Sequence, residues 1–348
     1  MLTFHSESTK LRRAKTELNE GLLMAPFECP ERVDLVLERI RASGLGPVQA
    51  PARFGLDPVL AVHDRDYVEF LASCWEEWKA AGMAGEAIPN IWPSRSMPGV
   101  RIPEHIEGRL GHYAQTGETS ICANTFEAAE VSKDIALSAL GHTLESGEPS
   151  FGLCRPPGHH ASSNQFGGYC FFNNAAIAAE QALRHGHSRV AVLDIDFHHG
   201  NGTQEIFYAR DDVIVVSLHG DPLHCFPYYL GHADETGSGR GEGFNVNYPM
   251  PPGTDYARWS AALDEGLARI RQVGAELLVV SLGVDTFEHD PISSFKLRSD
   301  DYPDVGRRLA ALGLPTVFLL EGGYAVEEIG INVVNVLSGF DAALARVE

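Results

Sequence analysis

Five short apolar segments in the second part of the chain constrain its fold more than any other feature. They span residues 151–154, 190–193, 213–218, 277–282 and 316–320. Amphipathic helical patterns, such as NNAAIAAEQALRHG and YARWSAALDEGLARIRQVG, separate several of them. Uniformly apolar strands that alternate with helices are typical of a mostly parallel sheet covered on both faces. The sequence therefore predicts an α/β fold.

The first 145 residues are dominated by helix and loop patterns. PERVDLVLERIRASG has helical apolar spacing, with Pro30 near its start and Gly44 as its stop, and RDYVEFLASCWEEWKAAG repeats the pattern. A Pro-rich insert of about residues 83–103 follows, and it is too irregular for a regular element. The insert could be an ordinary surface loop, whereas an exposed Trp92 would favour a lid or a subunit contact. We expect one domain over residues 1–348, with this helical part (1–145) joined to a β/α core (146–348).

Composition narrows the functional classes. No apolar run approaches the ~20 residues that cross a bilayer, so we expect a cytoplasmic protein without a membrane segment. The formal charge of −20 argues against non-specific nucleic-acid binding and is compatible with a cationic substrate. The six cysteines show no C-x-x-C spacing, which argues against a thiolate zinc site and a disulfide framework.

Polar residues follow each apolar segment at the point where the strand is expected to end. RPPGHH comes after Cys154, DIDFHHGNGT after Leu193, HGD after Leu218, GVDTFEHDP after Leu282 and EGGY after Leu320. In open α/β sheets, ligands bind at the carboxyl ends of the strands. We therefore predict an active site at this one edge of the sheet.

The segment LDIDFHHG has the pattern of a metal site. Asp194, Asp196 and His198 alternate in an extended segment, so their side chains share one face. Carboxylates that point the same way are costly unless a cation neutralises them. Asp196 and His198, with Asp285 from a neighbouring strand end, would leave positions open for water and substrate. Oxygen and nitrogen donors without sulfur suit Zn²⁺, with Fe²⁺ and Mn²⁺ as alternatives.

The tandem histidines and a tyrosine supply candidates for proton transfer. Next to a metal, His159 and His160 can act as general base and general acid, and each ring needs a partner on its second nitrogen. Asp194 could hold His159, whereas Asn201 could hold His160, and an amide does not stabilise an imidazolium as a carboxylate does. His160 is therefore the better proton shuttle. The Tyr324 hydroxyl could stabilise an oxyanion, and together these groups indicate metal-assisted hydrolysis of an amide or similar bond.

Six motifs in order, CRPPGHHA, GGYCFFNNAA, LDIDFHHGNGTQ, SLHGD, SLGVDTFEHDP and EGGY, resemble the zinc-dependent histone deacetylase superfamily. The resemblance is strongest to its bacterial acetylpolyamine amidohydrolases and extends over nearly the whole chain. It implies the arginase–deacetylase fold and usually one zinc per subunit, with Asp196, His198 and Asp285 as ligands. It also implies that Tyr324 polarises the acetyl carbonyl and that His160 is the general base and acid.

The resemblance assigns further residues around this centre. It implies a structural potassium site, formed by Asp194, Ser217, Leu218 and main-chain oxygens of Asp196 and His198. It also implies two aromatic walls for the methylene chain of the substrate, Tyr169 and Phe226, although the same loop offers Tyr228 and Tyr229 as alternatives to Phe226.

Substrate preference rests on acidic residues and on the insert. Glu107 and Glu118 are eleven residues apart, which on a continuous helix would place them within about 20° of one face. The resemblance associates acidic residues at these positions, and at Glu17, with the distal ammonium of polyamines. It also matches the Pro-rich insert to a segment that caps the active site of a neighbouring subunit, which implies a homodimer. Asn201 stands where many protein deacetylases have Asp, and this favours the small-molecule branch.

We therefore expect a dimeric zinc amidohydrolase that releases acetate from N-acetylated polyamines or short diamines, such as acetylputrescine and acetylcadaverine. A protein lysine deacetylase is the main alternative, and it would need an open mouth. A non-enzymatic metal-dependent binding protein is less favoured, because no member of the proposed catalytic set is missing. A binuclear manganese hydrolase would need further carboxylates near Asp196 and Asp285, where this chain has histidines.

Overall fold

An eight-stranded parallel sheet forms the centre of residues 1–96 and 101–345, which are the residues that the computed structural model describes. Its strands are β1 (Leu2–Phe4), β4 (Val48–Gln49), β5 (Ser150–Gly152), β6 (Val190–Asp194), β7 (Val213–Gly220), β8 (Asn245–Met250), β9 (Leu277–Leu282) and β10 (Thr316–Leu320). Their order is β4-β1-β5-β10-β9-β6-β7-β8, and all neighbouring pairs are parallel. This confirms the predicted α/β class.

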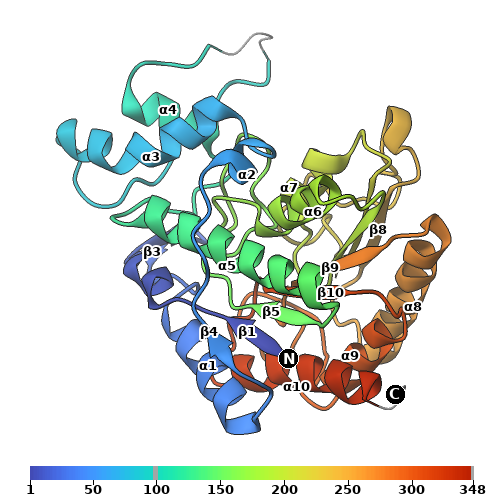
Figure 1. Cartoon of the computed structure of the whole chain (residues 1–348). Helices are drawn as coiled ribbons and strands as arrows, with labels where there is room; N and C mark the ends of the chain where they lie inside the picture. The colour runs from blue at the N-terminus through green and yellow to red at the C-terminus, as the bar shows by residue number, and fades with distance from the viewer. Residues whose placement is uncertain (97–100, 346–348) are drawn as a thin grey trace.

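Helices cover both faces of the sheet (Figure 1). They are α1 (Glu31–Ser43), α2 (Asp57–Leu60), α3 (Arg65–Ala80), α4 (Ile106–Tyr113), α5 (Thr125–Ser146), α6 (Asn174–Arg184), α7 (Asn201–Phe207), α8 (Tyr256–Val273), α9 (Tyr302–Ala310) and α10 (Ile329–Leu344). Two 3₁₀ turns, η1 (Glu7–Leu11) and η2 (Gly239–Gly241), and a small hairpin, β2 (Glu17–Asn19) with β3 (Leu22–Met24), complete the described elements.

The alternation of side chains along each strand builds two apolar layers. On β6, Ala191 and Leu193 pack with α1, α8, α9 and α10, whereas Val190 and Val192 pack with α5 and α6. Both sets are completely buried. A strand that is buried on both faces must be apolar at every position, which is why these segments were recognisable in the sequence.

All five predicted strands are present, and the helices expected from the quoted patterns correspond to α1, α3, α6 and α8. Gly44 ends α1 in the left-handed conformation, at φ 67°. The sequence did not indicate β1, β4 or β8, the other three strands of the main sheet. β1 and β4 contain three and two residues, too few to show a strand periodicity, and β8 is interrupted by Asn247 and Pro249 and therefore shows no apolar run.

The expected continuous helix from Glu107 to Glu118 does not exist. Helix α4 ends at Tyr113, and the next residue, Ala114, is already extended. The shared helix face that was to join these two glutamates is therefore wrong. Part of the Pro-rich insert, residues 97–100 with Pro98, lies outside the described residues.

A buried carboxylate ties the N-terminal segment to the core. Glu28 contacts the guanidinium groups of Arg12, Arg32 and Arg155 at 2.7–3.3 Å, and all four side chains are buried. Arg155 also donates to the carbonyl oxygens of Thr9 and Arg12. Removing one member would leave buried charge without a partner, which typically costs about 3–5 kcal/mol. This cluster fixes the start of RPPGHH against the N-terminal segment.

Two further findings concern membrane-spanning helices and disulfide bonds. Within the described residues, no helix combines the length and apolarity needed to cross a bilayer. All six cysteines are free thiols, as the absence of paired spacing suggested.

Candidate active site

The carboxyl ends of four strands bring the predicted catalytic and metal-binding residues together. His159 and His160 follow β5, Asp196 and His198 follow β6, Asp285 follows β9, and Tyr324 follows β10. Because β10, β9 and β6 are neighbours in the sheet, segments that are far apart in the chain converge at one edge. All six residues are buried, with exposures of at most 8%.

Asp196, His198 and Asp285 form one compact donor set. Their ligand atoms lie within 4.8 Å of one another. His198 Nδ1 lies 2.9 Å from Asp285 Oδ2 and 3.3 Å from Asp196 Oδ1. The backbone N–H groups of Phe197 and Gly322 donate to the remaining carboxylate oxygens, each at 2.7 Å. These bonds fix the carboxylates so that one oxygen of each faces His198.

The charges of this set fit a divalent cation. Burial and the neighbouring charge of Asp196 raise the pKa of Asp285, which means that the two carboxylates resist being ionised together. Burial opposes a charge on His198, but Asp196 and Asp285 outweigh it and raise its pKa. Without a metal, protons on Asp285 and His198 therefore offset the negative charge of the carboxylates. A cation bound by two oxygens and one ring nitrogen would replace these protons. The absence of sulfur agrees with Zn²⁺ or a similar ion.

Glycine at position 322 is required for this arrangement. A Cβ added there would lie 2.4 Å from Asp196 Oδ2 and 2.5 Å from Asp285 Oδ2. On the other side, a Cβ at Gly283 would lie 2.1 Å from Asp196 Oδ2. Both glycines therefore let backbone approach the carboxylates more closely than any side chain allows.

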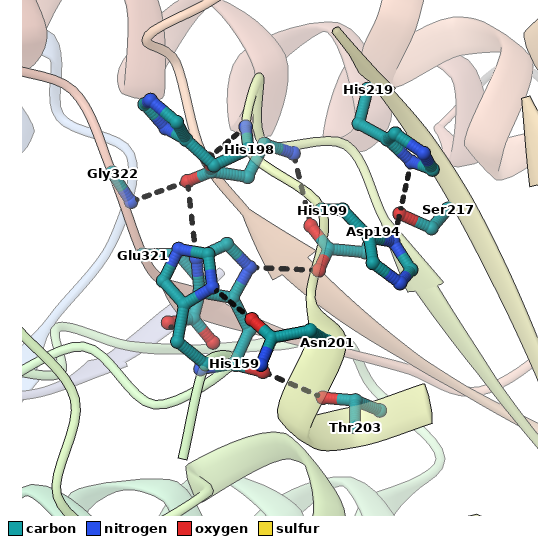
Figure 2. Close-up of polar contacts among 12 residues, drawn as sticks. His159, Asp194, His198, His199, Asn201, Thr203, Ser217, His219, Glu321 and Gly322 are labelled. Carbon is teal, nitrogen blue, oxygen red and sulfur yellow. Dashed lines mark hydrogen bonds and ion pairs between the residues drawn. The ribbon is translucent and has the colours of Figure 1, made fainter. Parts of the chain in front are cut away.

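The tandem histidines have different partners. His159 Nδ1 lies 2.8 Å from Asp194 Oδ2, a contact drawn in Figure 2. His160 Nδ1 lies 2.7 Å from Asn201 Oδ1, and the Asn201 amide in turn donates to Gln115 Oε1 at 2.9 Å. Both contacts match the pairs that the sequence suggested. Gln115 was not anticipated, because no motif marks it.

These partners separate the two imidazoles electrostatically. Burial disfavours charge on His159, yet the carboxylates of Asp194 and Asp196 prevail and raise its pKa to about 10. Burial and the charge of His159, whose ring centroid lies 4.0 Å away, lower the pKa of His160 well below its usual value. Near pH 7, His159 therefore carries a proton on both nitrogens, whereas His160 is neutral. Because the Asn201 oxygen can only accept, neutral His160 holds its proton on Nδ1 and keeps a lone pair on Nε2.

Buried polar groups hold the turn that carries Tyr324. Arg32 donates to the carbonyl oxygens of Glu321 and Gly323, and its guanidinium lies 4.8 Å from the centroid of the Tyr324 ring. Asp290 accepts the backbone N–H of Tyr324 at 2.7 Å. Burial raises the pKa of Tyr324 well above its usual value, so the hydroxyl keeps its proton and can donate it. No motif in the sequence marked Arg32 or Asp290 for these roles.

A cavity of about 540 Å³ leads to this centre. His160, His198 and Tyr324 line it, together with Glu17, Glu118, Tyr169, Asp221, Phe226 and Tyr228. Tyr169 lies 5.6 Å from Tyr324 between ring centroids, and Phe226 meets the His160 ring edge-on at 4.8 Å. Both predicted aromatic residues thus flank the reactive groups. Tyr229, one of the alternatives to Phe226, is 77% exposed and lies outside the described cavity wall.

The three predicted glutamates have different environments. Glu17 is buried and accepts the Tyr169 hydroxyl at 2.9 Å, and burial raises the pKa of Glu17 to about 7. Glu118 accepts the Gly168 N–H at 2.9 Å and also lines the cavity. Glu107, on α4, pairs with His105 at 3.8 Å and is absent from the described cavity wall. Of these three glutamates, Glu17 and Glu118 line the described cavity and Glu107 does not.

The residues matched to a potassium site lie beneath the metal-binding set. Asp194 ends β6, and Ser217 and Leu218 lie on the neighbouring β7. The Ser217 hydroxyl lies 3.0 Å from His199 Nδ1 and 2.8 Å from His219 Nδ1, as Figure 2 shows for His219. All these residues are buried in a polar layer.

Comparisons with known proteins show the family of the chain and relatives with the same overall fold. Residues 26–340 match the histone deacetylase domain family. The acetylpolyamine amidohydrolase of Mycoplana ramosa is 53% identical over 97% of this chain and 99% of its own length. Acetylpolyamine amidohydrolase 2 of Pseudomonas aeruginosa is 50% identical over 98% and 99%. A crystal structure of the acetylpolyamine aminohydrolase of Burkholderia pseudomallei superposes with a TM-score of 0.94, at 40% identity over 99% of each chain.

We expect Gly322→Ala to weaken metal binding without unfolding the protein. The new methyl group would displace Asp196 and Asp285, and we expect the affinity for Zn²⁺ to fall by at least about tenfold. Competition with a chromophoric chelator measures this affinity directly. Gly141→Ala is the control, because a Cβ at this position on α5 meets no atom within 4 Å. Unchanged affinity in Gly322→Ala would contradict the assignment of the site.

Proposed function

Because the chain belongs to the histone deacetylase domain family, we propose that it hydrolyses the acetamide bond of N-acetylated polyamines and short acetylated diamines. The observation that carries this proposal is one cavity that joins the Asp196–His198–Asp285 set to His160 and Tyr324. The relatives from Mycoplana and Pseudomonas, which align over nearly their full lengths, are acetylpolyamine amidohydrolases and supply the substrate class.

The cavity suits a slender chain with an acetyl group at its inner end. Tyr169 and Phe226 would pack on the two sides of the methylene chain, because both rings line the cavity close to the reactive groups. The Tyr324 hydroxyl would donate to the acetyl oxygen, and this bond strengthens as negative charge develops on that oxygen. Arg32 and Asp290 hold the tyrosine turn, so the donor is already oriented before the substrate arrives.

His160 moves the protons of the reaction. Its Nε2 lone pair would accept a proton from the attacking water while the water oxygen bonds to the acetyl carbon. The ring centroid of the resulting His160 imidazolium lies 4.0 Å from that of the charged His159 ring. The repulsion between the two charges makes the His160 imidazolium more acidic than a free one. It then donates the proton to the amine nitrogen as the carbon–nitrogen bond breaks. The second proton of the water stays on the acetic acid, which passes it to the released amine, so that the products leave as acetate and an alkylammonium ion while His160 returns to its neutral form.

The metal set would hold Zn²⁺, with Fe²⁺ as the alternative, through Asp196, His198 and Asp285. Bound Zn²⁺ supplies a Lewis acid that polarises the acetyl carbonyl and makes water more acidic. Asp194, Ser217 and Leu218, with main-chain oxygens of Asp196 and His198, would hold a structural K⁺ beneath it. The oxygen-rich composition of this second set supports a hard monovalent cation.

The cationic end of the substrate would meet acidic walls. Glu17 and Glu118 line the cavity, and the whole chain carries a formal charge of −20. An ammonium group would favour the ionised form of Glu17, whose pKa burial raises to about 7. Acetyl-lysine in a protein carries no such free ammonium, and this difference favours acetylated polyamines over the alternative, protein lysine deacetylation.

A comparison of four substrates tests this function. We expect kcat/KM for N-acetylcadaverine and N⁸-acetylspermidine to exceed that for an acetyl-lysine peptide. Pentylacetamide, which lacks the ammonium of N-acetylcadaverine, isolates the charge. We expect it to be at least about tenfold poorer, equivalent to about 1.4 kcal/mol. Preference for the peptide would instead establish the lysine deacetylase alternative.

Tyr324→Phe tests the assigned oxyanion donor. Loss of one such donor typically lowers kcat by about 10²–10³-fold, and KM should change far less because the ring remains. Steady-state kinetics on N-acetylcadaverine provide the measurement. Tyr256→Phe is the control, since its hydroxyl contacts Asp304 away from the cavity. Near-normal turnover of Tyr324→Phe would refute the role.

We further propose a homodimer through the Pro-rich insert, which would bring Glu107 towards the cavity of the partner. The insert exposes apolar side chains, with Ile91 at 59% and Trp92 at 42%, and it immediately precedes α4, whose Glu107 does not line the described cavity. We expect Ile91→Arg to convert dimer to monomer in sedimentation velocity. Leu11→Arg, on η1 and 53% exposed, should remain dimeric. A monomeric wild type would contradict this proposal.

A further inference from the structure

We propose that Glu321 is a positioning residue that joins the turn of His159 and His160 to the turn of Tyr324. It lies at the end of β10, and no step of the proposed reaction uses its side chain. The inference rests on the proposed function, since it assumes that these two turns carry the reaction.

The Glu321 carboxylate reaches across to the histidine turn. Its Oε2 accepts the backbone N–H of Gly158 at 2.6 Å and of His159 at 3.2 Å. Figure 2 shows Glu321 beside His159. Glu321 is 1% exposed, so the two bonds form without competition from bulk water. Among the described residues, these N–H groups have no other acceptor. This one oxygen therefore satisfies both N–H groups, while Gly202 and Thr203 donate to the His159 carbonyl oxygen from the other side of the turn.

The backbone of Glu321 belongs to the other turn. Its carbonyl oxygen accepts Arg32 Nη2 at 2.5 Å, and the next N–H, that of Gly322, donates to Asp196. Arg32 also holds the Gly323 carbonyl, directly before Tyr324. A single residue thus contacts both turns, and a change in the length of its side chain would alter the distance between the proton shuttle and the oxyanion donor.

Two observations favour a role in position over a role in charge. Oε1 of Glu321 has no hydrogen-bond partner among the described residues, so only one oxygen of the carboxylate is used. The charge that keeps His159 protonated comes mainly from Asp194, which bonds to its ring, and from Asp196. What the histidine turn needs is an acceptor at the correct distance.

Two conservative substitutions separate these roles. Glu321→Gln keeps the length and one acceptor oxygen but removes the charge, whereas Glu321→Asp keeps the charge and withdraws the oxygens by one methylene. We expect Glu321→Gln to retain kcat within about threefold and Glu321→Asp to lose about 10–100-fold, with KM nearly constant, because a misplacement of about 1 Å can cost that much. The reverse order would overturn the proposal in favour of a charge role.

Amide hydrogen exchange of residues 155–161 provides a readout that does not depend on turnover. We expect exchange at Gly158 and His159 to accelerate by about tenfold or more in Glu321→Asp and to stay near wild type in Glu321→Gln, since only the shorter side chain withdraws the acceptor of both N–H groups. Equal protection in both variants would overturn the proposal. If the wild type hydrolyses none of the acetylated amines, the proposed function fails, while exchange still decides whether Glu321 orders this turn.

Asp134→Ala is the matched control for stability. Asp134 is a buried carboxylate on α5 that accepts the Phe54 N–H at 3.0 Å, outside the described cavity wall. We expect this variant to unfold at lower denaturant concentration and to keep its kcat. Zinc content should equal that of wild type in every variant compared. If Asp134→Ala lowers kcat as much as Glu321→Asp does, loss of stability explains both effects and the proposal is overturned.

Discussion

Two carboxylates, Asp196 and Asp285, face the imidazole of His198 in a buried site. The surrounding structure must offset the electrostatic repulsion between them. Their charges repel, and burial removes the water that would screen them. The chain supplies backbone N–H groups from two separate turns and glycines that let those turns approach. These devices reduce the electrostatic cost but do not cancel it. The remaining negative charge is what makes this set a candidate site for a cation.

The cost of burying charge also explains why the two adjacent histidines differ in protonation. Both rings are buried, yet His159 faces the carboxylate of Asp194 and His160 faces the amide of Asn201. One partner stabilises an imidazolium, and the other only fixes a tautomer. The charged ring then keeps its neighbour neutral at a centroid distance of 4.0 Å. A single difference between Asp and Asn thus leaves one ring charged and the other neutral, which is the difference that the proposed proton transfer by His160 uses.

The sequence was most informative where burial or chemistry leaves a local pattern. Continuous apolar runs revealed β6, β7, β9 and β10, and the polar residues after them located the metal set. It did not indicate β1 and β4, which are too short to show periodicity, or β8, in which Asn247 and Pro249 interrupt the apolar residues. It also misjudged the segment from Glu107 to Glu118, because spacing alone cannot show that α4 ends at Tyr113. Arg32, Gln115 and Glu321 act through partners far away in the chain, so no local pattern could identify them.

The acidic residues of the cavity also determine the position of its aromatic wall. Tyr169 adopts φ 66°, an unusual conformation for a non-glycine residue, and it is held at both ends. Its hydroxyl bonds to Glu17, and its N–H donates to Thr119, whose hydroxyl donates to Glu118. Because Glu17 and Glu118 both line the cavity and hold the Tyr169 ring, the charge and the width of the cavity are coupled. In the proposed function, selection for a slender cation would act on one connected set of residues.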